Sequence, residues 1–180
     1  MATVPTTLVF VTGQVVTAAQ LNGDVGGTWG PFVLSPPWCQ VRQTVAQNIA
    51  TSAWTGLLFD TEDDDQDLWH SLAANTDRIV PQTPGWVRLE GGASFATNAT
   101  GFRGTRWALN GTAIAGSQEI VPAATGGATV VGARSVAVQV NGTTDIITLQ
   151  VFQSSGGTIA TTVSGVEAQS SITAEWRGTT

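Results

Sequence analysis

The stretch Ile79-Val-Pro-Gln-Thr-Pro-Gly-Trp-Val-Arg-Leu-Glu-Gly-Gly-Ala-Ser-Phe95 has the pattern of a strand that stops, turns and restarts. Pro81 cannot donate a hydrogen bond to a sheet, so we expect it at the end of the first strand. Pro84-Gly85 indicates a turn, because proline fixes φ and glycine tolerates a positive φ. The second strand is indicated by apolar residues at every second position, namely Val87, Leu89, Ala93 and Phe95.

The rest of the chain has the same β character. Its 180 residues are 42% apolar and only 11% charged, with 21 glycines, which is typical of a folded chain rich in strands and turns. From Trp54 onward, about nine or ten short strand patterns alternate with turn signals, including Asn110-Gly111 and Asn141-Gly142. This regular alternation predicts a β-sandwich or barrel.

Charge and hydropathy argue against several classes of protein. The net charge is −6, with seven arginines, no lysine and thirteen acidic residues, so neither a nucleic-acid-binding nor an anionic-membrane-binding surface is expected. No apolar run approaches the roughly 20 residues that span a bilayer. The first residues lack the basic segment of a secretory signal, so we expect synthesis in the cytoplasm.

Catalytic motifs are not visible in the sequence. There is no nucleophile elbow, phosphate-binding loop or Ser-His-Asp arrangement, so we expect no enzymatic activity. Cys39 is the only cysteine, which rules out an intrachain disulfide, and a small buried thiol is expected rather than a nucleophile.

The first 53 residues differ from the rest. Thr17-Ala-Ala-Gln20 has the spacing of a capping box, and the helix that it opens must be very short because Gly23 follows at once. The segment from Trp29 to Trp38 mixes aromatic residues with prolines and is too short to form a core of its own. We therefore expect residues 1–53 to form an extended attachment arm with a very short helix, and residues 54–180 to form the sandwich.

Several stretches after Trp54 resemble, in their order along the chain, the C1q/TNF-like family: Leu58-Phe-Asp60, Ile79-Val-Pro81 with Pro84-Gly-Trp86, Gly101-Phe-Arg-Gly-Thr-Arg106, Leu109-Asn-Gly111 and Gln150-Val-Phe-Gln-Ser-Ser-Gly-Gly157. The resemblance implies an all-β, antiparallel jelly-roll sandwich that assembles as a homotrimer around an apolar axis. Trp86 stands where these domains usually carry tyrosine.

The segment Phe10-Val-Thr-Gly-Gln-Val-Val-Thr-Ala-Ala-Gln-Leu-Asn22 resembles the opening of structural proteins of tailed bacteriophages, where it precedes a fibre or binding domain. Together the two resemblances imply a non-enzymatic virion protein: a homotrimeric capsid decoration or head-fibre-like protein that docks through its arm on the major capsid or tail proteins. The apolar arm residues are the expected partner contacts: Phe10, Leu21, Trp29, Phe32 and Trp38.

The alternative is a tail-tip or minor tail fibre protein whose jelly roll binds a host receptor or a host surface glycan. In that case Trp69 and His70 are the candidate contacts, although a lone histidine is more often structural. No cofactor is expected, except that Asp63, Asp65 and Asp67 alternate in an acidic loop and could hold Ca²⁺. A solvated loop is the simpler interpretation of such a run. A glycan array with and without a chelator separates these hypotheses.

Overall fold

A computed structural model describes residues 11–22 and 35–179, apart from the side chain of Leu21. These residues contain twelve strands, one short α-helix and one short 3-10 helix, η2 (Val166–Ala168). The helix α1 (Ala18–Leu21) is a single turn, and both hydrogen bonds of the predicted capping box between Thr17 and Gln20 are present. No helix in the described ranges has the length and hydropathy needed to cross a membrane.

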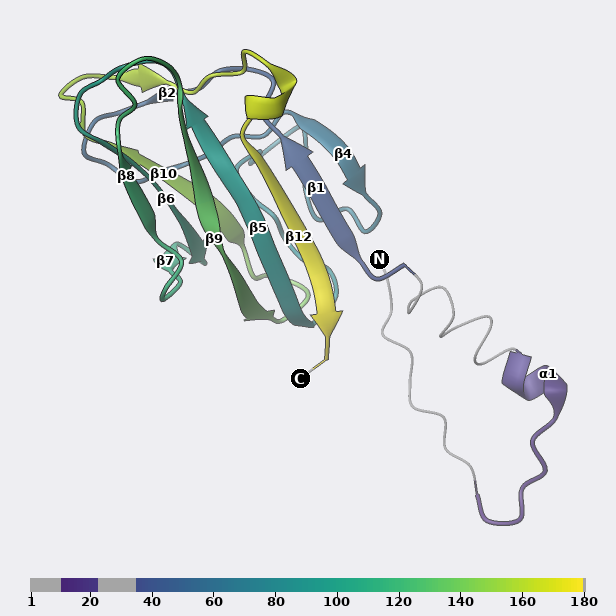
Figure 1. The fold of residues 1–180 in the computed structure, drawn as a ribbon. Coiled ribbons are helices and arrows are strands. Elements are labelled where there is room, and N and C mark those ends of the chain that lie inside the picture. Colours follow the sequence, from purple (N-terminus) through teal and green to yellow (C-terminus); the bar gives the residue numbers. More distant parts are fainter. Residues whose placement is uncertain (1–10, 23–34, 180) are drawn as a thin grey trace.

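Two antiparallel sheets form a sandwich (Figure 1). The front sheet has the strand order β4-β1-β12-β5-β9. Its strands are β4 (Thr61–Asp65), β1 (Trp38–Arg42), β12 (Ser171–Gly178), β5 (Gly85–Phe95) and β9 (Thr129–Val140). Strands far apart in sequence are therefore neighbours, as in a jelly roll, and the last strand of the chain lies at the centre of the sheet.

The back sheet has the order β3-β10-β6-β7, and β8 also pairs with β6. Its strands are β3 (Thr55–Gly56), β10 (Ile147–Gln153), β6 (Phe102–Leu109), β7 (Thr112–Ala113) and β8 (Glu119–Pro122). The remaining strands, β2 (Asn48–Ile49) and β11 (Ile159–Ala160), pair with each other. The tight turn predicted at Asn110-Gly111 is confirmed, since both residues have positive φ and join β6 to β7.

The second half of the stretch from Ile79 to Phe95 folds into the predicted strand. Strand β5 buries the side chains at its alternate positions, including Val87 and Leu89, both fully buried. Gly85 is the first residue of β5; it has φ of +139°, and a Cβ there would lie 2.2 Å from the Gly178 carbonyl oxygen, so only glycine fits at the start of this strand. The first half differs from the prediction: in place of a strand, Ile79 makes one isolated bridge to Ile147.

The space between the sheets is filled by one apolar core. Its largest fully buried apolar side chains are Trp69, Trp107, Phe59, Phe95, Ile49, Leu57, Ile79, Leu89, Ile147, Leu149 and Ile172. Trp107 also donates its indole hydrogen to the Arg134 carbonyl oxygen at 2.9 Å, so its one polar atom is satisfied.

The sandwich begins before residue 54. Strand β1 pairs along its whole length with β12, and its inward side chains Cys39 and Val41 are buried in the core. The expected boundary at residues 53/54 therefore does not coincide with an edge of the sandwich. The acidic run is also not a loop as expected: residues 61–65 form the edge strand β4, because pairing with β1 supplies their backbone hydrogen bonds.

Candidate functional site

The predicted arm contacts fall in two parts of the chain. Phe10, Trp29, Phe32 and the side chain of Leu21 lie outside the described residues. Trp38 is the first residue of β1 and belongs to the sandwich, opposite Glu175 of β12. Its partly exposed side chain lines a hollow of about 290 Å³ on the outer side of the front sheet. Trp38 can still contact a partner, but from the sandwich and not from an arm.

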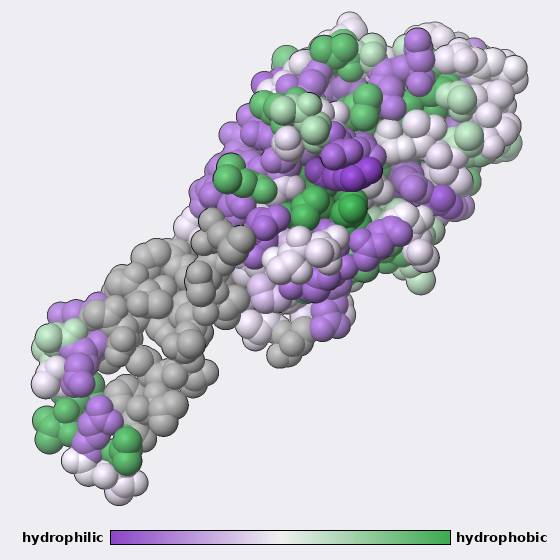
Figure 2. All heavy atoms as spheres, turned by 180° about the vertical axis from the view of Figure 1, so that it is seen from behind, coloured by the Kyte–Doolittle hydropathy of each residue, from purple (hydrophilic) through white to green (hydrophobic). Residues whose placement is uncertain are grey.

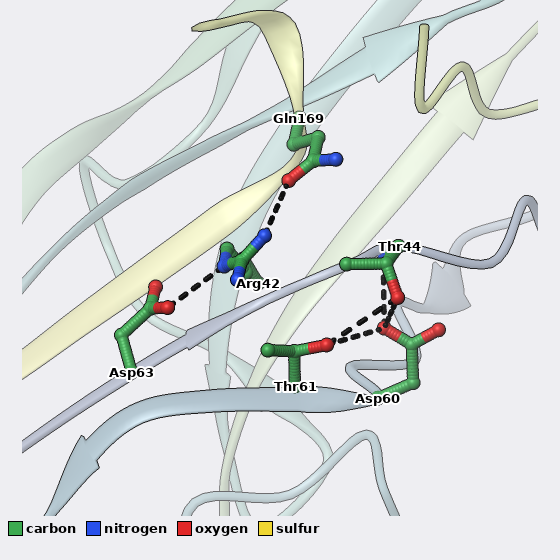
Figure 3. A network of polar contacts seen from close by, with 6 residues as sticks. All are labelled: Arg42, Thr44, Asp60, Thr61, Asp63 and Gln169. Carbon is green, nitrogen blue, oxygen red and sulfur yellow. Dashed lines mark hydrogen bonds and ion pairs between the residues drawn. The ribbon is translucent and has the colours of Figure 1, made fainter. Parts of the chain in front are cut away.

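The acidic run is held to β1 by a polar network (Figure 3). Asp60 Oδ1 accepts hydrogen bonds from the backbone nitrogen and the hydroxyl of Thr44, at 2.6 and 3.1 Å. Arg42 Nε lies 2.7 Å from Asp63 Oδ1, and Arg42 Nη1 donates to Gln169 Oε1 at 3.0 Å. The network thus joins β4 and β1 to the segment between η2 and β12.

The three carboxylates predicted to hold Ca²⁺ serve different partners. Asp63 pairs with Arg42, whereas Asp65 accepts the backbone N–H groups of Trp69 and His70, each at 2.8 Å. Asp67 is buried near the Thr83 hydroxyl. Across the described ranges, no three His, Cys, Asp or Glu side chains gather as a metal cluster. The three carboxylates are not arranged around one point in this structure, so the Ca²⁺ site stays a prediction from the sequence.

Trp69 and His70 follow β4 in the chain, and both side chains are buried. Their exposed fractions are 1% and 6%, and the receptor or glycan contact at these residues stays a prediction from the sequence. The His70 ring is fixed between Glu62 Oε1, 2.8 Å from Nδ1, and the Thr76 carbonyl oxygen, 3.1 Å from Nε2. Because each ring nitrogen lies at hydrogen-bonding distance from an oxygen atom, these two contacts hold the ring in one orientation.

Cys39 and Asp65 face each other across the β1–β4 pair. Burial raises the pKa of the Cys39 thiol, and the nearby carboxylates of Asp65 and Glu62 raise it further, so the thiol stays protonated and unreactive. Burial also raises the pKa of Asp65, although the hydrogen bonds from His70 and Trp69 oppose that shift. The predicted inert thiol is confirmed as free and buried.

The outer face of the back sheet carries a group of side chains that sequence patterns did not single out. Trp54 and Phe152 lie with ring centroids 5.3 Å apart, and the Arg106 guanidinium sits 4.2 Å from the Trp54 ring centroid. Arg106 Nε donates to Gln150 Oε1 at 2.7 Å. Gly104 leaves room for them, since a Cβ there would lie 3.3 Å from Trp54. We call Trp54, Gly104, Arg106, Gln150 and Phe152 the aromatic platform.

The sequence held one signal for this platform. Gly104 stands between Phe102 and Arg106 in a strand pattern, and glycine inside a strand often marks the close approach of another group. The strand patterns around the tryptophans gave no such signal. Trp54 is partly exposed and Trp86 is 42% exposed, whereas Trp107 is fully buried.

Comparisons with known proteins establish the fold. No protein-family model and no curated protein matches the sequence. Two crystal structures of murine APRIL, a TNF-family protein, are similar to this chain. The structure at pH 8.5 matches with a TM-score of 0.55 and 12% sequence identity, and the structure at pH 5.0 matches with a TM-score of 0.54 and 11% identity. Each match covers 77% of this chain and 98% of the APRIL chain. The chain therefore has the antiparallel jelly-roll sandwich fold of the TNF-like proteins.

Proposed function

We propose that this chain is a non-enzymatic structural protein of a tailed-bacteriophage virion, a homotrimeric capsid decoration or head-fibre-like protein. The supporting observation is a TNF-like jelly roll that follows a segment resembling the opening of phage structural proteins. Residues 1–34 dock the trimer on a capsid or tail protein, and the sandwich projects outward. The boundary at about residue 34 replaces the one at residue 53, because β1 belongs to the sandwich.

The described part of the N-terminal segment supports docking. Val11 and Val15 are 71% and 84% exposed, so apolar side chains are left to be covered by a partner. Residues 11–22 carry no charged side chain. Contacts made by this segment would therefore depend on apolar burial and hydrogen bonds, and should change little with salt.

We assign contact between copies to the outer face of the front sheet around Trp86. Domains with the C1q/TNF-like fold associate as threefold trimers, and this face exposes a large aromatic side chain on β5. The charges beside Trp86 are already paired within the sheet, Arg88 with Glu90 and Arg177 with Glu175. Burying charges that are paired in advance costs much less than burying a lone charge.

A structural function also agrees with the contacts that the titratable side chains make. Glu62 and Asp65 of β4 contact His70, and Asp65 stands opposite Cys39 of β1, which makes this the group of titratable residues that most resembles a catalytic cluster in the described ranges. The carboxylates and the histidine are engaged in hydrogen bonds that hold the turn after β4, and the thiol is buried. These groups stabilise the edge of the sandwich and are not arranged around a substrate.

Particle composition tests the proposal. Mass spectrometry of purified particles, made from the genome that encodes this chain, should detect it in a fixed ratio to the capsid protein, and particle images should place it on the head or the tail. A chain lacking residues 1–34 should remain trimeric but be missing from particles. Absence of the full chain from particles contradicts the virion assignment, and incorporation of the truncated chain contradicts docking through residues 1–34.

A further inference from the structure

The aromatic platform contains the one arginine, Arg106, that is partly exposed and is not paired with a carboxylate among the described residues. Five of the seven arginines pair with acidic side chains: Arg42 with Asp63, Arg78 with Asp77, Arg88 with Glu90, Arg134 with Glu119 and Arg177 with Glu175. Arg103 is fully buried and donates to the backbone carbonyls of Asn98, Thr100 and Phe102.

Arg106 differs from the other six. It stacks on Trp54 and donates Nε to the neutral amide of Gln150, which leaves its two Nη groups without an acceptor in the described part of the chain. A guanidinium held over an indole ring, with both Nη groups free of an acceptor from the described residues, is well placed to bind a carboxylate. In a chain of net charge −6, one unbalanced and oriented cation indicates a ligand that brings its own anion.

A hollow of about 230 Å³ adjoins the platform, and Gln150 belongs to both. The side chains of Asp77, Arg78, Asn110, Thr148 and Gln150 line it. Thr148 is 8% exposed and no protein group pairs with its hydroxyl oxygen. Donors and acceptors of this kind, next to aromatic surface, match the alternating hydroxyl and C–H groups of a sugar.

Platform and hollow are continuous along β10. Thr148, Gln150 and Phe152 alternate on the outer side of this strand and stand opposite Ala108, Arg106 and Gly104 of β6. Four residues of strand span about 13 Å, which is longer than one sugar ring. Phe102 and Ile120, 52% and 42% exposed, extend the apolar surface beyond Gly104. From behind, this side of the molecule shows hydrophobic residues set beside strongly hydrophilic ones (Figure 2).

We propose that the outer face of the back sheet binds an acidic oligosaccharide. Arg106 pairs with the carboxylate of one sugar residue, Trp54 and Phe152 pack against its apolar ring face, and the neighbouring sugar hydroxyls enter the hollow beside Thr148 and Gln150. The site differs from the Trp69 and His70 contact expected from the sequence. It also does not depend on the virion assignment, because it requires only the folded sandwich.

Sugar binding by the full-length protein tests this proposal. An array of uronic-acid and sialic-acid oligosaccharides, with their carboxyl-reduced neutral counterparts, is screened first, and the bound sugars are then titrated by calorimetry. We expect the acidic sugars to bind, and Arg106→Gln and Trp54→Ala each to weaken binding at least tenfold. Thr148→Val, which keeps the side-chain shape, should weaken binding severalfold while leaving the fold intact, so it remains informative if Trp54→Ala fails to fold.

The matched controls lie on the opposite face. Arg177→Gln removes an arginine that is paired with Glu175, and Trp38→Ala removes a partly exposed tryptophan beside the other hollow. Both should bind the acidic sugars as the native protein does. The proposal is overturned if no acidic sugar on the array binds, if the neutral counterparts bind equally well, or if Trp38→Ala abolishes binding while Arg106→Gln has no effect.

Discussion

The two outer faces of the sandwich carry similar side chains but balance their charges differently. On the front sheet, Trp86 lies next to Arg88, which is paired with Glu90. On the back sheet, Trp54 lies under Arg106, which has only the neutral Gln150 as a hydrogen-bonding partner among the described residues. A tryptophan beside a neutral ion pair suits contact with an identical copy, whereas a tryptophan beside a lone cation suits an anionic ligand.

Removing the exposed tryptophan of the front face should have the largest effect. Trp86→Ala should weaken the trimer by about 2–4 kcal/mol, because a large aromatic side chain at the centre of an interface is typically a hot spot. Sedimentation equilibrium over a range of concentrations measures this change. The matched Trp54→Ala protein should keep the native mass, and equal dissociation of both variants would show that the two faces do not differ in assembly.

Making the front face resemble the back face should have the next largest effect. Glu90→Gln leaves Arg88 without its carboxylate, so trimer formation would bury a lone cation. We expect the trimer to weaken by about 2 kcal/mol, with little change in the stability of the single chain, where the pair is half exposed. Sedimentation and thermal unfolding of the same samples separate the two quantities, and unchanged association would argue against burial of this face.

Making the back face resemble the front face should have a smaller effect on the stability of the protein. Gln150→Glu places a carboxylate where Arg106 Nε now meets an amide oxygen at 2.7 Å. The new pair should stabilise the fold by roughly 0.5–1 kcal/mol and lower the affinity for acidic sugars at least tenfold, since the cation is then neutralised. Chemical denaturation and calorimetry check the two effects. Retained sugar affinity in this variant would contradict the role of Arg106.

Replacing Asp65, at the edge of the front sheet, should have the smallest effect on stability, and this effect should depend on pH. Because the pKa of Asp65 is raised above its ordinary value of 3.8, the folded state binds this proton more tightly than the unfolded state. The stability that this group contributes therefore falls as pH rises from about 3.8 through the raised pKa. The melting-temperature advantage of the native protein over Asp65→Asn should shrink across that range; an advantage that grows with pH would refute the shift.

Local patterns in the sequence were sufficient for elements whose causes are local. The period of two in β5, the Asn110-Gly111 turn and the Thr17 capping box depend on residues a few positions apart, and the structure confirms each of them. The rest depended on partners far away in sequence. Residues 61–65 have poor strand propensity, yet they form β4 because β1 pairs with them, which is a tertiary override of local preference.

The two tryptophans at positions 54 and 69 illustrate the same limit. Trp69 follows an acidic run and was expected at the surface, but Asp65 accepts the backbone N–H groups of residues 69 and 70 and turns both side chains into the core. Trp54 stands at the start of the strand-rich region, and the register of β10 with β6 places Gly104 where the indole can lie across the sheet. Neither outcome follows from spacing along the chain.

The central proposal is that three copies associate through the outer face of the front sheet, where the charged side chains are paired. The mass of the full-length protein in solution tests this proposal most directly. Sedimentation equilibrium or light scattering at micromolar concentration should give three times the single-chain mass of 18.6 kDa, and this mass should change little between low and high salt. A particle of 18.6 kDa at these concentrations would contradict the homotrimer and the assignment of the Trp86 face to self-association.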